Sequence, residues 1–79
     1  MGYPFKTQED GVKFLKSIDG LDVGRHESKH LYTAEPVGFP RTVAYVDTGG
    51  MLYFVDKGRQ ELKKYHDAIQ MALNERFLN

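Results

Sequence analysis

The most recognisable chemical pattern lies at His26-Glu27-Ser28-Lys29-His30, where an acid follows the first of two histidines. On an α-helix this spacing of four residues sets both imidazoles on one face, one turn apart, where they can bind zinc. Glu27 would then activate a metal-bound water as a general base. A chain that used these residues in this way would be a zinc-dependent hydrolase.

This spacing resembles the signature of zinc metalloproteases, which implies zinc as the cofactor and peptide hydrolysis as the reaction. The extended form of the motif is absent, because Thr33 stands where its glycine would be. Gly24 precedes the motif, and the flanking residues fit a strand at least as well as a helix. A third ligand is also required, and nothing favours one candidate over the others: Glu35, Glu61 or His66. We therefore expect no enzymatic activity and no cofactor, and zinc hydrolysis is the remotest hypothesis.

A second pattern is a group of basic residues around the expected start of the last helix. The N-terminal amides and the positive dipole end of a helix favour phosphate, and basic side chains add to that field. The order helix, three strands, helix also matches the double-stranded RNA-binding domain, as an analogy at the level of the fold. Glu61 and Asp56 dilute the charge. Binding of duplex RNA or DNA is therefore the alternative function, with these phosphate-binding candidates: Lys57, Arg59, Lys63 and Lys64.

Composition limits the remaining possibilities. The 79 residues carry 11 basic and 11 acidic side chains, so the net charge of zero gives no overall field that attracts nucleic acid or anionic membrane. The absence of cysteine excludes disulfides, thiolate zinc sites and thiol nucleophiles. No apolar run is long enough to span a membrane, and the N-terminus lacks the apolar region of a signal peptide. We expect a cytoplasmic protein with no membrane partner.

The elements that would position any site are organised around Arg41–Asp56, which reads as a β-hairpin. Both arms are rich in β-branched and aromatic residues, and Asp47-Thr48-Gly49-Gly50 supplies the positive φ angles that a tight loop requires. Two strands bury too little surface to be stable alone, so the flanking segments must cover one face of this hairpin.

The turn type decides which face is covered. A three-residue loop with glycine in the left-handed conformation places Ala44 and Val46 beside Leu52 and Phe54, on the face opposite the tyrosines. A two-residue Gly-Gly turn would instead place Val43 and Tyr45 beside Leu52 and Phe54. We favour the first register, which leaves an uncovered face with these candidate partner-binding residues: Val43, Tyr45, Tyr53 and Val55.

The flanking segments supply two helices and one further strand. Thr7 fits the N-cap of a helix that ends near Asp19, and a last helix begins after an Asp56 or Gly58 cap. Its apolar face comprises Leu62, Tyr65, Ile69, Ala72, Leu73 and Phe77. The segment 25–35 alternates like a strand but also fits a helix stopped by Pro36, and we favour the strand. Residues 1–6 are expected to be a flexible lead-in.

The sequence thus predicts one α+β domain over residues 7–79, with a helix, three antiparallel strands and a helix, both helices packed on one face of the sheet. We expect a small, non-catalytic intracellular binding module that acts as an adaptor, regulator or inhibitor. Its most plausible partner is a larger protein, and a homodimer through the open face is a further possibility.

Overall fold

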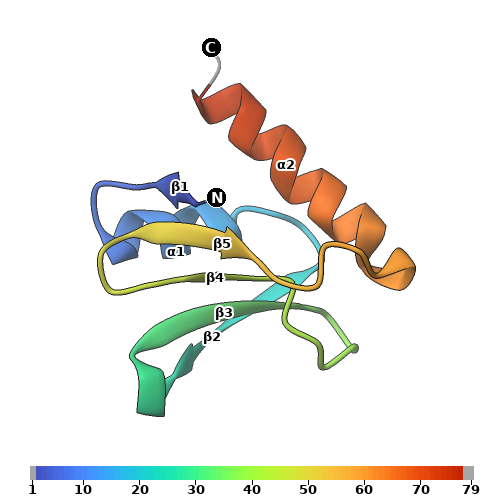
Figure 1. The fold of residues 1–79 in the computed structure, drawn as a ribbon, viewed down its shortest axis with the longest axis horizontal. Coiled ribbons are helices and arrows are strands. Elements are labelled where there is room, and N and C mark those ends of the chain that lie inside the picture. Colours follow the sequence, from blue (N-terminus) through green and yellow to red (C-terminus); the bar gives the residue numbers. More distant parts are fainter. Residues whose placement is uncertain (1, 78–79) are drawn as a thin grey trace.

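The computed structural model describes residues 2–77, which form a five-stranded antiparallel sheet and two helices (Figure 1). The α+β class expected from the sequence is therefore confirmed. The helices are α1 (Gln8–Lys16) and α2 (Lys63–Phe77). The strands lie in the spatial order β1-β5-β4-β3-β2, with these bounds: β1 Tyr3–Pro4, β2 Leu21–His26, β3 Leu31–Pro36, β4 Ala44–Val46 and β5 Met51–Phe54.

The sheet has two more strands than the three that the sequence predicts. β1 lies in the expected flexible lead-in, where Tyr3 pairs with Leu52 of β5. Phe5 follows β1, is only 6% exposed, and donates its N–H to the Gly50 carbonyl at 2.9 Å. β2 pairs along its whole length with β3. The prediction of three strands was wrong because both additional strands are sheet edges, whose residues carry no strong amphipathic pattern.

The central hairpin adopts the register favoured from the sequence. Tyr45 pairs with Tyr53 and Ala44 with Phe54. The Gly50 N–H donates to the Asp47 carbonyl at 3.0 Å, and Gly50 has φ +90°, which closes a turn followed by a left-handed glycine. The Asp47 carboxylate also accepts the N–H of Gly49 and that of Met51. The turn residues therefore fix which side chains face the helices.

The segment 25–35 is strand at both ends and not a helix. It comprises the end of β2, a 3-10 turn over Glu27–Lys29, and most of β3. His30 closes the turn with φ 57°, the left-handed conformation. The preference for strand over helix in this segment is thus confirmed, with a turn in its middle.

Helix α1 begins as the sequence predicts and ends three residues earlier. The Thr7 hydroxyl accepts the Asp10 N–H at 3.1 Å, a standard N-cap, and the C-cap is Ser17 instead of a residue near Asp19. Gly11 faces the sheet, and a Cβ at this position would lie 2.8 Å from a methyl of Val46. The absence of a side chain there lets α1 pack closely on β4.

The last helical segment begins with a 3-10 turn over Gln60–Leu62, so α2 itself starts at Lys63 and neither Asp56 nor Gly58 caps it. Asp56 has φ 55° and turns the chain out of the sheet. The predicted apolar face is confirmed, since Leu62, Ile69 and Leu73 are fully buried.

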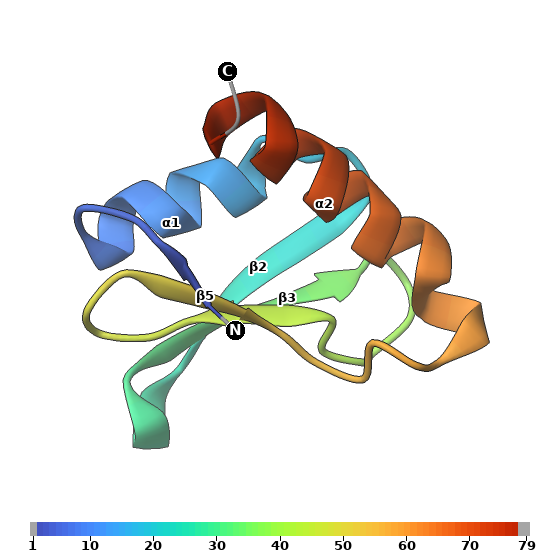
Figure 2. The same ribbon diagram turned by 45° about the horizontal axis from the view of Figure 1, so that its top comes forward.

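Both helices lie on the same side of the sheet (Figure 2). The buried residues form one cluster between the helices and this side, comprising Phe5, Phe14, Leu15, Ala34, Val43, Ala44, Val46, Leu52, Leu62, Ile69 and Leu73. No α-helix within residues 2–77 lies over the opposite side. Within residues 2–77, no helix is long and apolar enough to cross a membrane.

Candidate functional site

The face of the sheet opposite the helices is the candidate site, which we call the open sheet face. Strand alternation and the pairing registers place Tyr45 and Tyr53 side by side on it, with ring centroids 5.2 Å apart and planes inclined at 30°. Both side chains are half-buried. By the same registers the face also carries Pro4, Asp22, Gly24, His26, Leu31, Thr33, Glu35 and Met51.

Of the four predicted partner-binding residues, Tyr45 and Tyr53 lie on this face and Val43 does not. Val43 is fully buried in the core, because Val43 and Ala44 together oppose Ala34 as in a β-bulge and both point toward the helices. The expectation that Val43 faces outward was therefore wrong. Val55 follows β5, is half-buried, and donates its N–H to the Val43 carbonyl at 2.9 Å.

The surroundings of the tyrosine pair leave it accessible. A hollow of about 360 Å³ adjoins Tyr53, lined also by Tyr3, Phe54 and Lys57. At the other end of the face, residues of the loop 37–40 line a hollow together with Asp22 and Glu35. Phe39 in this loop is 40% exposed. The half-buried tyrosine pair thus borders a hollow at the edge of β5, whose other aromatic walls, Tyr3 and Phe54, belong to the helix side of the sheet.

The basic residues at the start of the last helix mostly interact with neighbouring groups. Arg59 pairs with Glu61 at 2.6 Å and Lys63 with Asp67 at 2.7 Å. The ammonium of Lys57 lies 4.6 Å from the centre of the Phe54 ring, and that of Lys64 lies 5.1 Å from the Tyr65 ring. The two ion pairs reduce the charge that Arg59 and Lys63 present to a phosphate, whereas the neutral rings leave the charges of Lys57 and Lys64 in place.

The negative charge of Glu61 also offsets the charge of these basic residues. The backbone N–H of Glu61 and the Arg59 guanidinium both lower the pKa of the Glu61 carboxyl below its usual value. The carboxylate therefore stays charged and opposes the basic group at neutral pH. The stabilisation that these contacts give is fully present at pH values above the ordinary pKa of a glutamate. It is lost as the pH falls through the lowered pKa of Glu61.

The histidine motif does not adopt the geometry of a zinc peptidase. His26 ends β2 and His30 sits in a left-handed turn, so the two rings do not lie on successive turns of one helix. The His26 ring nitrogen Nδ1 lies 3.2 Å from the Ser28 hydroxyl. Within residues 2–77, no three acidic or histidine side chains gather closely enough to hold a metal ion. The residues present therefore do not fit a zinc site.

His66, named from the sequence only as a possible metal ligand, is a core residue on α2. It is 3% exposed, and its Nε2–H donates to the Val55 carbonyl at 2.8 Å. The ring meets Phe54 edge-on at 5.7 Å. His66 therefore ties α2 to the segment after β5, which sequence reasoning missed because a lone histidine on an apolar helix face carries no specific signal.

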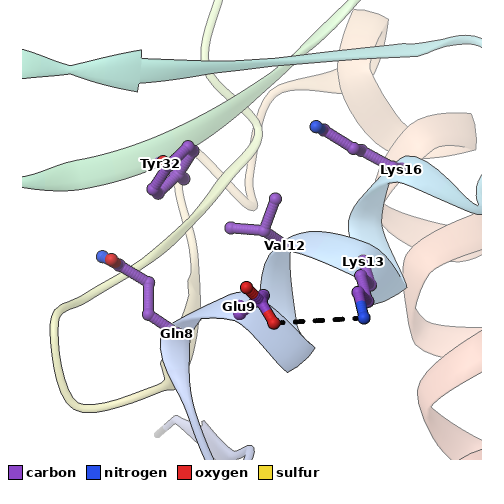
Figure 3. Close-up of a pocket in the computed structure, with 6 residues that line it drawn as sticks. All are labelled: Gln8, Glu9, Val12, Lys13, Lys16 and Tyr32. Atoms are coloured by element: carbon purple, nitrogen blue, oxygen red, sulfur yellow. Dashed lines mark ion pairs between the residues drawn. The ribbon is translucent and has the colours of Figure 1, made fainter.

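A second hollow, of about 410 Å³, lies between α1 and β3 (Figure 3) and was not expected from the sequence. Glu9 and Lys13 form an ion pair across its rim at 4.0 Å. The Gln8 amide donates to the His30 carbonyl at 2.9 Å, which ties α1 to the turn before β3. This hollow has no aromatic pair like that of Tyr45 and Tyr53, so the open sheet face is the better candidate site.

The chain is a small α+β domain with both helices on one side of its antiparallel sheet and the half-buried tyrosine pair on the other. Comparison with known protein families, with curated proteins and with solved structures found no match.

Proposed function

We propose that this chain is a stoichiometric binding module, an adaptor, regulator or inhibitor, that docks on a larger protein through the open sheet face. The observation that carries the proposal is the Tyr45–Tyr53 pair, with its rings 5.2 Å apart on the face that neither helix covers. Tyrosine is enriched among the residues that dominate the energy of protein interfaces. The proposed mode of action is occupancy of the partner's surface, without turnover.

The physical basis is the low entropic cost of ordering this pair. Both tyrosines sit on paired strands, and their rings already pack on one another, so binding freezes few additional rotamers. Within residues 2–77, the hydroxyl groups of Tyr45 and Tyr53 make no hydrogen bond to another side chain or to the backbone. They are therefore available to a partner, while the rings supply apolar contact area.

The hollow beside Tyr53 adds a place for an anchoring side chain. Its walls are aromatic except for Lys57, whose ammonium lies over the Phe54 ring. An apolar or aromatic side chain of the partner that enters this hollow would contact Tyr3 and Tyr53 together. Pockets next to exposed aromatic residues are where interface energy concentrates.

The proposal predicts that the variant Tyr45→Ala/Tyr53→Ala loses its partner. Each truncation should cost about 2 kcal/mol of binding free energy, or roughly 30-fold in affinity. The measurement is affinity capture from a native lysate by the immobilised chain, with and without nuclease, followed by mass spectrometry.

The matched control is Met71→Ala, which removes an apolar side chain that is 67% exposed on α2. This control should capture the same protein as the unmodified chain. Full capture by a folded double variant would contradict the proposal. Capture that nuclease abolishes would favour the nucleic-acid alternative through the basic residues.

A further inference from the structure

The two edges of the sheet differ in how well they are protected. β1 has only two residues and includes Pro4, which lacks a backbone donor, so that edge is blunted. β2 has six residues without a proline, and its register with β3 is unbroken from Leu21 to His26. β2 is the edge strand at the opposite end of the sheet from β1 (Figure 1). An edge of this length is a template for a further strand.

The pairing with β3 fixes which backbone groups of β2 point outward. The Val37 N–H donates to the Gly20 carbonyl at 2.8 Å, which sets the phase of the antiparallel ladder. By alternation, the backbone N–H and C=O groups of Asp22, Gly24 and His26 form hydrogen bonds with β3. Leu21, Val23 and Arg25 therefore direct their N–H and C=O groups away from the sheet, where a second strand can bind them.

The side chains of β2 carry a charge pattern that the single chain leaves uncompensated. Asp22 pairs directly with Glu35 across the two strands, and like charges in this arrangement are unfavourable. Among the ion pairs within residues 2–77, none includes either of these acids. His26 lies on the same face as Asp22, two pleats further along β2.

Gly24 lies between Asp22 and His26, and no contact within a single chain requires a glycine there. A Cβ at this position would meet no atom within 4 Å, its φ lies outside the left-handed region, and the register shows no bulge. A glycine inside a strand often marks the close approach of another backbone. The charge pattern and the glycine thus both point to a second strand along β2.

We propose that the occupant is β2 of a second copy of this chain, paired antiparallel about a two-fold axis at Gly24. In this register Val23 of one copy exchanges backbone hydrogen bonds with Arg25 of the other. The Gly24 residues face each other in a close, non-hydrogen-bonded pair. Asp22 of each copy lies opposite His26 of the other. The imidazole of His26 then offers a hydrogen-bond donor to the neighbouring carboxylates of Asp22 and Glu35.

The symmetry has a consequence for the docking surface. A two-fold axis perpendicular to the sheet keeps both pairs of helices on one side and both open sheet faces on the other. The dimer would therefore present two tyrosine pairs on one continuous surface. The dimer does not depend on the proposed docking function, and either can fail alone.

The test is sedimentation equilibrium of the unmodified chain and of Val23→Pro, with Val23→Thr as the matched control. The unmodified chain should show a reversible monomer–dimer equilibrium. Val23→Pro removes an outward N–H that β3 does not use, so dimerisation should weaken about tenfold or more. Val23→Thr keeps the donor and should dimerise like the unmodified chain.

A charge exchange tests the register independently of the proline variant. Asp22→Lys removes the acceptor opposite His26, and His26→Asp sets two acids opposite each other, so each should weaken the dimer. The double variant Asp22→Lys/His26→Asp should restore it by setting an ammonium opposite a carboxylate. Circular dichroism establishes that each variant is folded, which both exposed positions should allow. A monomer at millimolar concentration, or a dimer indifferent to Val23→Pro or to the charge exchange, would overturn the proposal.

Discussion

Replacing Gly50 by alanine should lower the free energy of unfolding by about 2–5 kcal/mol, the sum of the cost of a left-handed alanine and that of overpacking. Gly50 has φ +90°, which an L side chain rarely adopts. An added Cβ would lie 2.6 Å from the Phe5 carbonyl oxygen and 2.9 Å from the Thr7 carbonyl carbon. These are backbone atoms that cannot rotate away, so the hairpin turn and the N-terminal segment would have to separate.

Gly49→Ala is the matched control one residue earlier. A Cβ there would meet only a side-chain oxygen of Asp47, at an ordinary 3.5 Å, and Gly49 is exposed. Its stability should change by no more than about 0.5 kcal/mol, as for most surface substitutions. Thermal unfolding measures both, and each kcal/mol corresponds to roughly 4–8 °C in a domain of this size. Equal melting temperatures for the two variants would show that Gly50 does not anchor the N-terminal segment.

The second large effect is expected at Leu52, whose side chain is fully buried on the helix side of β5. Leu52→Ala should cost about 2–5 kcal/mol, because it removes apolar contacts and leaves a cavity among Val46, Tyr3 and the helices. In a domain whose total stability is of the order of 5 kcal/mol, this loss leaves a large fraction of the chain unfolded.

Tyr53→Ala, at the next residue, tests whether the sheet has only one covered face. Tyr53 points to the open side and packs mainly on Tyr45, so its truncation should cost only about 0.5–1.5 kcal/mol, the value of an aromatic pair. Urea denaturation of both variants gives the comparison. Equal destabilisation by Tyr53→Ala and Leu52→Ala would mean that something packs on both faces of the hairpin.

Much of this fold could be predicted because local chemistry and tertiary structure agree. The Asp47–Gly50 turn selects one hairpin register, and that register alone decides that the two tyrosines share a face. Thr7 caps α1 through its own side chain. The apolar residues of α2 repeat with the helical period and are buried as that period requires.

The edge strands could not be predicted, because their structure comes from pairing and not from their own residues. β1 has two residues, too few to carry a periodic pattern, and exists because it adds to β5. Most of β2 is exposed, so the alternation that marks a half-buried strand is weak. The residues of the histidine motif are exposed as well, so their pattern fits helix and strand equally. Only the pairing of β2 with β3 distinguishes the two.

Two features of the candidate site were hidden from the sequence for related reasons. The bulge that turns Val43 inward breaks the alternation on which the face assignment depends. The compensation of Lys63 by Asp67 is visible as a spacing of four residues, but the pairing of Arg59 with Glu61 depends on the 3-10 turn. A count of basic residues therefore overstates the charge available to a phosphate.

The most direct test of the open sheet face is hydroxyl-radical footprinting of the chain, alone and with its captured partner. We predict that Tyr45, Tyr53 and Met51 are oxidised in the isolated chain, whereas Leu52 is protected by the helices. The partner should then protect the two tyrosines. Tyrosines as protected as Leu52 in the isolated chain, or fully reactive in the complex, would contradict the account.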